Sequence, residues 1–446
     1  MFVQVSLFKD YSASLPNRGQ DGLAKRITYG DDVRQRISSQ CLKAGFRSHQ
    51  PMVAVIDGDE VADDMRSFAD RLGIGMAHRS RHVFDTVVVP ALIKDFGNEE
   101  EAKMWGRSFA DLFLKPGDAG KERDDKDSKA YSCGYLDQPL VIGEREAEAI
   151  VAGVKVFREA GISASGGVGD LRDLFEKRGT AKKISKSLLA SKKISAEEVD
   201  AKEKALDDAI SNIRSLKAHA GLDGALFGRM ATGSVISRVE SCVHVAHAIT
   251  VHAIQASADY FSVQDSLSED DDPGASHTNN TEIASGLFYG YAVIDVRQVT
   301  QNFAGLSPEQ QAETVAWIVR AIYASECSAK RGATAGYGAG LYFLAETGRR
   351  QPRTLAAAFQ KAIPTKDRKD DRPMWQRAIS ELKDHREDLN LKGGAPAAAY
   401  DTEDQDIRDA ARSTNRAAYE VIADRVKADV LSWLLGQQAP VQVAAE

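Results

Sequence analysis

The strand-like segments of this sequence are separated by a long helical region, and this separation constrains the fold more than any other feature. Residues 2–8 alternate between apolar and polar side chains, as a half-buried strand does. Residues 51–224 instead show helical periodicity, broken by charged loops. Further strand patterns follow at residues 241–254, 287–296 and 341–345. The sequence therefore predicts an α+β chain in which a helical region interrupts a small antiparallel sheet.

This interruption predicts a discontinuous first domain. Residues 1–50 and 225–365 together show the strand and helix pattern of a ferredoxin-like core, which is also the core of an RNA-recognition motif (RRM). Residues 51–224 form the helical insertion. Residues 256–284 are a long polar connection with an acidic tip, and such long loops are usually functional or disordered. Residues 366–446 form a charged helical extension at the C-terminus.

Several helices are expected from apolar periodicity and from signals at their ends. The clearest start is Ser307-Pro-Glu-Gln310, a capping box with proline at the first helical position. The other expected helices span residues 61–72, 99–114, 144–160, 196–219, 354–363, 373–391 and 404–436. A small-residue linker at residues 393–399 is expected to separate the last two.

The composition excludes several classes of protein. The chain has 446 residues and a formal net charge of −7, so any nucleic-acid binding must use a local cationic patch. Cys41, Cys133, Cys242 and Cys327 lie far apart, which fits neither a disulfide framework nor a zinc site. The sequence shows no signal-peptide pattern and no apolar run long enough to span a bilayer. We therefore expect a cytoplasmic protein with no membrane partner.

Motifs for cofactors and metals fail their context tests. The Gly-rich loop at residues 328–340 lacks the Gly-Lys-Ser/Thr ending of a phosphate-binding P-loop, and it leads into a strand rather than a helix. Three histidines lie on one expected strand, but His247 points away from His244 and His252. One metal ion would therefore not reach all three. We expect no cofactor, no metal and no catalytic residue.

A short helix is expected within residues 34–47, and one of its faces is polar. At about 100° per residue, Gln40, Lys43 and Arg47 fall on one stripe. Arg36 extends this stripe if the helix begins early enough. The two serines before Gln40 are natural N-caps. Cations and amides beside a helix N-terminus suit a polyphosphate, and the solvated face of an ordinary helix is the alternative.

Five segments, taken together and in order, closely resemble one family. They are residues 36–43, 225–232, 245–252, 259–261 and 285–291. The resemblance is to CasC, the repeated backbone subunit of the type I-E CRISPR surveillance complex, Cascade. It implies an RRM-like palm, a helical finger domain inserted into it, and a thumb at the long connection.

The resemblance also implies a function in antiviral defence. CasC subunits are scaffolds, and cutting of the target belongs to a recruited helicase-nuclease. Copies polymerise along the spacer of a CRISPR RNA (crRNA), grip its backbone and kink it at regular intervals so that it pairs with target DNA. The implied partners are therefore crRNA, target DNA through pairing, neighbouring copies and other Cascade subunits.

The resemblance places RNA contacts in a loop near the start, on the palm helix, near a kink, at the thumb base and in the loop after the second palm helix. In chain order these residues are Asn17 and Arg18; Arg36, Ser38, Gln40, Lys43 and Arg47; Arg229 and Met230; Tyr260 and Phe261; and Lys330 and Arg331. Cations bind phosphates without reading bases, which suits a guide whose spacer varies.

Two other functions fit the same residues. One is a type III-like backbone subunit that cuts target RNA with a magnesium-binding loop acid, Asp31 or Asp32. The other is a general single-stranded RNA-binding protein outside CRISPR. Sequencing of bound RNA distinguishes the general RNA-binding protein from a crRNA-binding subunit. Metal-dependent cleavage of complementary RNA distinguishes the type III-like subunit.

Overall fold

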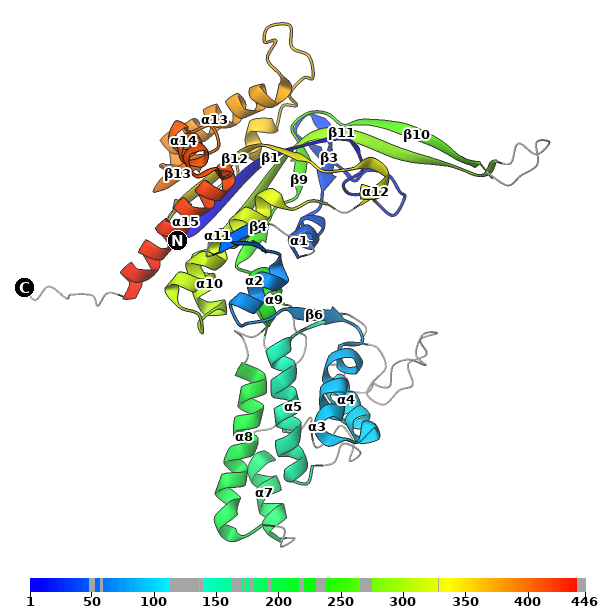
Figure 1. The fold of residues 1–446 in the computed structure, drawn as a ribbon, viewed down its shortest axis with the longest axis vertical. Coiled ribbons are helices and arrows are strands. Elements are labelled where there is room, and N and C mark those ends of the chain that lie inside the picture. The colour runs from blue at the N-terminus through cyan, green and yellow to red at the C-terminus, as the bar shows by residue number, and fades with distance from the viewer. Residues whose placement is uncertain are drawn as a thin grey trace, which may run out of the picture. The chain divides into compact units, whose positions relative to one another are not determined.

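The chain forms two compact units (Figure 1). The computed structural model describes residues 1–47, 53–56, 59–112, 136, 139–162, 171, 174–175, 180–190, 194–215, 220–229, 238–264, 275–327 and 329–438. The sheet unit comprises Met1–Met65, Val243–Arg297 and Leu306–Glu446. The helical unit comprises Arg66–Cys242 and Gln298–Gly305, so it starts and ends later than the expected insertion.

An antiparallel sheet of nine strands dominates the sheet unit. Strand β1 (Phe2–Ser14) lies at its centre, between β11 (Ala275–Asp295) and β12 (Ala339–Gly348). All three strands are longer than their alternating cores predicted. Residues 3–9 of β1 are buried without a break, because helices cover both faces of the sheet here.

The remaining strands extend the sheet on both sides. The order across the sheet is β13–β12–β1–β11–β9–β3–β2, and β8 and β10 also pair with β11. Their bounds are Arg26–Tyr29 for β2, Asp32–Ile37 for β3, Val243–Val245 for β8, Ala248–Thr250 for β9, Gln255–Gln264 for β10 and Ala398–Asp401 for β13. A separate two-stranded sheet joins β4 (Val53–Ile56) to β5 (Asp59–Ala62).

The expected strand at residues 241–254 is divided into β8 and β9. Val245 faces Ala292 of β11, whereas Ile249 faces Tyr289, so the register changes by one residue between the two strands. An extra residue of this kind is a β-bulge, and it turns the following side chains to the other face. The single alternation predicted over the whole segment is therefore wrong.

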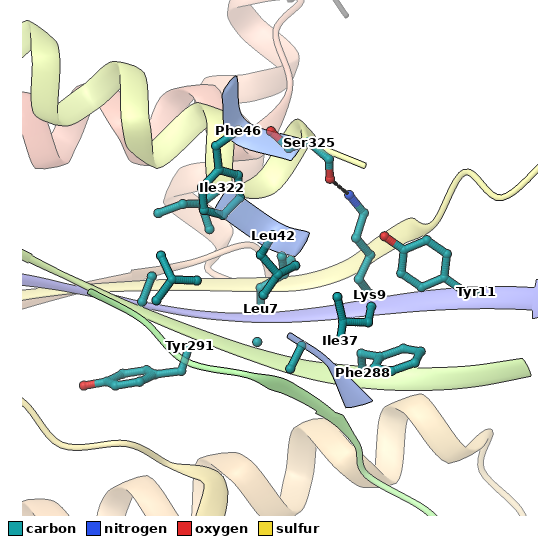
Figure 2. A pocket seen from close by; sticks show the side chains of 14 residues that line it. Leu7, Lys9, Tyr11, Ile37, Leu42, Phe46, Phe288, Tyr291, Ile322 and Ser325 are labelled. Carbon is teal, nitrogen blue, oxygen red and sulfur yellow. Dashed lines mark hydrogen bonds between the residues drawn. The ribbon is translucent and has the colours of Figure 1, made fainter. Parts of the chain in front are cut away.

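Helices cover the two faces of the sheet. α1 (Ser39–Arg47) and α11 (Pro308–Ala324) lie over one face, above a cavity of about 40 Å³ whose lining includes Leu7 and Phe288 (Figure 2). The predicted capping box of α11 is confirmed, because the Gln310 N–H donates to Ser307 Oγ at 3.3 Å. α13 (Met374–Gly393) packs on the other face, in a cluster with Phe8.

The segment expected to form a helix at residues 354–363 is mostly irregular. Only Ala356–Phe359 forms a 3₁₀ turn. The Leu355 N–H donates to the Tyr289 hydroxyl at 3.1 Å, and the Ile363 N–H donates to the Val251 carbonyl at 2.9 Å. The helix prediction is wrong because these backbone donors bond to β11 and to the residue after β9, instead of to carbonyls within their own segment.

The C-terminal region is an integral part of the sheet unit. The expected linker at residues 393–399 runs directly into β13, which pairs with β12 at the edge of the sheet. The single helix expected at residues 404–436 is two helices, α14 (Gln405–Thr414) and α15 (Ala418–Gln438). Asn415 ends α14 in the left-handed conformation with φ 52°, which a continuous helix excludes.

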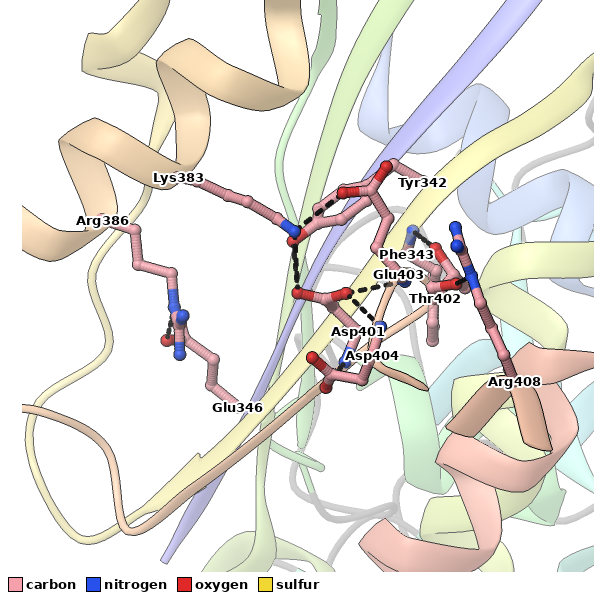
Figure 3. A network of polar contacts seen from close by, with 10 residues as sticks. All are labelled: Tyr342, Phe343, Glu346, Lys383, Arg386, Asp401, Thr402, Glu403, Asp404 and Arg408. Atoms are coloured by element: carbon pink, nitrogen blue, oxygen red, sulfur yellow. Dashed lines mark hydrogen bonds and ion pairs between the residues drawn. The ribbon is translucent and has the colours of Figure 1, made fainter. Parts of the chain in front are cut away.

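Buried polar contacts tie this region to β12 (Figure 3). The Tyr342 hydroxyl donates to Asp401 Oδ2 at 3.1 Å, and Lys383 of α13 pairs with Asp401 at 3.5 Å. Arg386 pairs with Glu346 at 2.8 Å, and only 3% of the Glu346 side chain is exposed. Without the C-terminal region, the buried Glu346 would lose its partner Arg386 and the Tyr342 hydroxyl would lose its acceptor Asp401, so the sheet requires that region.

The helical unit packs around a core of aromatic side chains. Phe157 and Phe175 meet edge to face with ring centroids 6.3 Å apart, beside the buried Trp105 and Phe109. Its strands β6 (Ala77–Ser80) and β7 (Leu140–Gly143) pair. Its helices are α2 (Met65–Arg71), α3 (Val89–Phe96), α4 (Glu99–Leu112), α5 (Glu144–Glu159), α7 (Thr180–Ala190), α8 (Val199–Ser215) and α9 (Gly221–Phe227), with a π-helical turn at Phe84–Val88.

The boundary between the two units falls within helix α10 (Val296–Asn302), after Arg297. Over the part of the chain that the structure describes, none of the helices combines the length and apolar composition needed to cross a bilayer.

Candidate nucleic-acid interface

A β-hairpin projects from the sheet where a long connection was expected (Figure 1). β10 pairs with the first half of β11, from Gln255 opposite Ser285 toward the tip. Tyr260 lies opposite Asn280, and 67% of Tyr260 is exposed. A large exposed aromatic side chain on a projecting hairpin is suited to stacking on nucleic-acid bases. The side chain of Phe261 lies outside the described residues.

The loop before β2 is fixed to the base of this hairpin. The Ala24 N–H donates to Glu282 Oε2 at 2.8 Å, and Arg26 forms an ion pair with the same carboxylate. Asn17 Oδ1 accepts the Ser38 N–H at 2.9 Å, so this amide holds the loop against the start of α1. Arg18 is exposed. Of the two predicted contacts in this loop, the Arg18 side chain is therefore the more accessible.

Helix α1 presents the predicted polar stripe. Gln40 is exposed, Lys43 and Arg47 are half-buried, and Phe46 is buried on the opposite side. Arg36 does not extend the helix as expected, because it belongs to β3. Its guanidinium instead lies beside α1, with Nη1 3.3 Å from His247 Nδ1. The stripe thus receives a third cation from a neighbouring strand.

The N-terminus of α1 already has acceptors from the protein. Ser38 is the N-cap, since its buried hydroxyl accepts the Cys41 N–H at 3.4 Å. His247 Nδ1 accepts the Ser39 N–H at 3.2 Å. Burial and the nearby Arg36 lower the pKa of His247, which keeps this nitrogen an acceptor. The expected anion site at the helix N-terminus is therefore partly occupied, and the side-chain cations carry the positive charge.

The three histidines do not form a metal site. His252 is buried, its Nδ1 lies 2.7 Å from the Ala253 carbonyl, and its Nε2 accepts the Leu287 N–H at 3.2 Å. Burial lowers the pKa of His252, as expected for a neutral ring bonded at both nitrogens. Within the described ranges, no group of three or more histidine, cysteine or acidic side chains is placed to hold a metal ion.

The Gly-rich segment carries a second pair of cations to the hairpin. Lys330 precedes the short helix α12 (Arg331–Thr334), and its Nζ donates to Thr281 Oγ1 at 2.6 Å. The Arg331 guanidinium lies 5.2 Å from the ring centre of Tyr337, and 58% of Tyr337 is exposed. We call residues 329–338 the cationic loop. It adds two cations and an exposed aromatic ring to the surface at the hairpin base.

The two loops meet opposite faces of the hairpin. Directly opposed residues share a face and neighbours alternate, so Tyr260 lies on the face of Glu282, whereas Thr281 lies on the other face. Glu282 binds the loop before β2, and Thr281 binds the cationic loop. Arg18, Tyr260, Lys330 and Arg331 therefore gather at one end of the sheet, but on both sides of the hairpin.

Two glycines at the end of the Gly-rich segment, Gly338 and Gly340, permit close packing. A Cβ on Gly338 would lie 2.7 Å from the Tyr11 ring, and one on Gly340 would lie 2.6 Å from the Tyr323 ring. Both contacts are too short for any side chain. These two glycines therefore have a packing role, because any side chain at either position would clash with a tyrosine ring.

Three residues that support this loop were not predicted. Lys9, Tyr11 and Glu326 meet beneath it, with Lys9 Nζ 2.6 Å from Glu326 Oε1 and the Tyr11 hydroxyl donating to Glu326 Oε2 at 2.7 Å. Figure 2 shows Lys9 reaching from β1 to the carbonyl of Ser325. The available signal was that Lys9 continues the face of Val3, Val5 and Leu7, because a lysine on an apolar face implies a buried carboxylate partner.

Arg229 is not available as an RNA contact. Its side chain is fully buried in the helical unit, where it forms an ion pair with Glu146 at 2.5 Å and donates to the Val141 carbonyl at 3.1 Å. A buried guanidinium with a carboxylate partner serves the core of its own unit. The predicted role of Arg229 is therefore corrected, and Met230 lies outside the described residues.

Asp31 is tied to the protein. Its carboxylate accepts the Ala362 N–H at 2.9 Å and pairs with the buried Arg34 at 3.2 Å. The Ala362 N–H bond, with help from Arg34, holds the pKa of Asp31 below its ordinary value. These contacts fasten the turn between β2 and β3, and they occupy one of the two carboxylate oxygens that a cation would need.

The fold and the interface together define an α+β protein with a projecting hairpin and cations gathered at its base. The sequence matches the family model of the CT1975-like proteins over residues 3–427, so the chain belongs to that family. This confirms the expected CasC-type family. The match extends well beyond residue 365, and the C-terminal region is therefore a family feature rather than an added tail.

Solved structures share the fold over nearly the whole chain. One, described as "CRISPR RNA-guided surveillance complex, pre-nicking", has a TM-score of 0.65 and 22% identity, covering 96% of this chain and 100% of that chain. Another, described as "CRISPR RNA-guided surveillance complex", has a TM-score of 0.55 and 18% identity, covering 90% of each chain. A comparison with curated proteins gives no significant match.

Proposed function

We propose that this chain is a crRNA-binding backbone subunit of a CRISPR RNA-guided surveillance complex, acting in the cytoplasm as a type I-E Cascade component. The observation that carries the proposal is the gathering of Arg18, Lys330 and Arg331 around the base of a hairpin with an exposed Tyr260. Family membership and the two surveillance-complex structures support the same assignment.

The arrangement suits a guide of variable sequence. Gln40, Lys43 and Arg47 offer an amide and two cations from one helix face, and such groups bind phosphates irrespective of the base. A chain with a net charge of −7 binds RNA through this local patch, and its acidic remainder limits stray contacts.

The hairpin suits the proposed thumb. It projects beyond the sheet, and its two faces carry different groups, with Tyr260 on one and the Lys330 contact on the other. We propose that neighbouring copies line up along the spacer and that the hairpin kinks the strand at regular intervals, leaving short segments free to pair with target DNA. Other subunits of the surveillance complex are the remaining proposed partners.

The finer fold assignment is an RRM-like palm. Four antiparallel strands form this core, and their order across the sheet is β12–β1–β11–β9. Numbered by their order in the chain, these are the fourth, first, third and second strands. Helices α1 and α11 lie on one face. This order supports a ferredoxin-like core. The opposite face is covered by α13, so the RNA is proposed to bind at the end of the sheet rather than across it.

The test is co-expression with a CRISPR array and the partner subunits, followed by sequencing of the co-purified RNA. Repeat-spacer guides are expected. A mixed RNA population would instead favour the general RNA-binding protein, and an RNA-free subunit would contradict both.

A double substitution tests the helix face. Lys43→Ala with Arg47→Ala should weaken RNA binding and lower the slope of log K against log salt by about 1.4, at roughly 0.7 for each single-strand phosphate contact. Arg408→Ala with Arg412→Ala is the matched control, because α14 follows β13 at the other edge of the sheet. Unchanged binding by the first variant would place the RNA elsewhere.

We propose that the subunit is a scaffold and not an enzyme. The alternative, RNA cleavage by Asp31 or Asp32, is less well supported because Asp31 bonds to Ala362 and Arg34. Incubation of the assembled complex with complementary RNA and Mg²⁺ decides between them. No cleavage is expected, and cleavage that Asp32→Ala abolishes would establish the enzyme.

A further inference from the structure

We propose that Glu326 is a positioning residue for RNA binding, which holds the cationic loop in place from beneath without touching the RNA. This inference rests on the proposed function. The Glu326 carboxylate lies next to the loop that carries Lys330 and Arg331. It keeps that loop ordered, although it is not itself part of the RNA-binding surface.

The Glu326 carboxylate receives three donors from two parts of the chain, β1 and the cationic loop. Oε1 pairs with Lys9 Nζ at 2.6 Å, and Oε2 accepts the Tyr11 hydroxyl at 2.7 Å. Oε2 also accepts the Gly338 N–H of the cationic loop at 3.2 Å. Two of these donors come from the central strand β1, so the carboxylate connects the loop to the most buried strand of the sheet.

Lys9 fixes the carboxylate in turn. Its Nζ donates to the carbonyls of Tyr323 at 3.1 Å and Ser325 at 2.7 Å, which lie at the C-terminal end of α11. A cation at this position is favourable, because the carbonyls at a helix C-terminus carry partial negative charge. Glu326 follows directly, so the start of the loop is held by the helix end and by β1 together.

The contact at Gly338 is one of two that place the loop. The other is the bond from Lys330 to Thr281 of the hairpin. Gly338 lies directly on the Tyr11 ring, so the loop backbone has no space to move inward. Loss of the Glu326 contact would release the end of the loop that includes Gly338 and Tyr337, and Arg331 lies over the Tyr337 ring.

Glu326→Gln tests the proposal in the full-length protein. Glutamine has one acceptor oxygen, so it cannot receive both Lys9 and Gly338. Hydrogen exchange of the Gly338 amide is expected to rise at least about tenfold, as for loss of a bond to a charged group. The salt slope for a labelled single-stranded RNA is expected to fall by about 1.4, for two phosphate contacts.

A second variant separates positioning from stability. Lys9→Met with Glu326→Met removes both buried charges, and methionine offers the Gly338 N–H no oxygen acceptor, so this variant should fold better while the Gly338 bond stays lost. The RNA defect is expected to persist in this double variant and to be relieved in Glu326→Asp. Recovery of RNA binding together with stability would overturn the proposal.

Glu346→Gln is the matched control, since only 3% of the Glu346 side chain is exposed, against 10% for Glu326, and Glu346 pairs with Arg386 near the other end of β12. It should lower stability and leave the RNA salt slope unchanged. An equal RNA defect in this control would also overturn the proposal. If the wild-type protein binds no RNA, the proposed function fails, and the exchange rate of Gly338 alone decides whether Glu326 holds the loop.

Discussion

Individual polar residues of the interface divide into those used by the protein and those open to solvent. Asn17 and Ser38 were predicted from a resemblance to contact RNA, and both bond to the backbone around α1. Arg18, Gln40 and Tyr260 are exposed. Helical spacing predicts which face a residue occupies, but it contains no information about the partner that a distant segment supplies. His247, the acceptor at α1, is such a partner.

Cys41 is expected to be the most reactive of the described cysteines. It is half-buried, whereas Cys242 and Cys327 are buried, and a hydrogen bond with the Cys327 thiol lowers its pKa. Cys327→Ala removes that bond, so the midpoint of the pH dependence of Cys41 alkylation should rise. Mass spectrometry of iodoacetamide-treated protein measures it, with Cys242→Ala as the control. An unchanged midpoint in Cys327→Ala would contradict this prediction.

Asp31 is expected to stabilise the fold in a pH-dependent way. Its pKa is depressed below the ordinary 3.8 in the folded protein, so its contribution is present above that value and is lost as the pH falls through the folded pKa. Asp31→Asn should therefore lower the free energy of unfolding at pH 7, and the deficit should shrink as the pH approaches 3.8 and falls below it. Urea unfolding at several pH values measures this difference, and a deficit independent of pH would contradict it.

At the scale of secondary structure, alternation and capping predicted the centres of elements better than their ends. The cores of β1, β11 and β12 and the start of α11 are where the sequence indicates. The bulge between β8 and β9 and the edge strand β13 were not predicted. Both depend on the register with a strand far away in sequence, and residue patterns within one segment do not contain that register.

The joint between α14 and α15 gives a prediction for one backbone position. Asn415 adopts φ 52°, which costs about 1–2 kcal/mol for a residue with an ordinary side chain and nothing for glycine. Asn415→Ala is therefore expected to destabilise the protein by about 1 kcal/mol, whereas Asn415→Gly should be neutral within a few tenths. Chemical denaturation measures both. Equal stability of the two variants would show that this conformation is not strained.

At the scale of the whole molecule, the interface is a property of one end of the sheet unit. Segments near residues 17, 40, 260, 282 and 330 come together there. Spacing within each segment suggested cations and aromatic rings, and the family resemblance suggested that they act together. The sequence did not indicate Glu326, because its role arises only where β1, α11 and the cationic loop meet.

Assembly along the guide predicts a dependence on RNA length. If copies line up on the spacer, lengthening the spacer should increase the number of subunits in steps, while the RNA-free subunit stays at its own size. Native mass spectrometry of complexes purified with guides of graded length counts the copies. A copy number independent of guide length would contradict polymerisation, although RNA binding itself would stand.

The central position of β1 has a consequence for synthesis. Phe2 pairs with Asp295 and with Gly348, so the first strand made waits for partners that leave the ribosome almost 300 residues later. At about 5–20 residues per second, that interval is tens of seconds. The Arg66–Cys242 part of the helical unit is made within this interval, while the sheet is still incomplete. If the subunit binds a guide as proposed, newly made copies become able to join it only near the end of their translation.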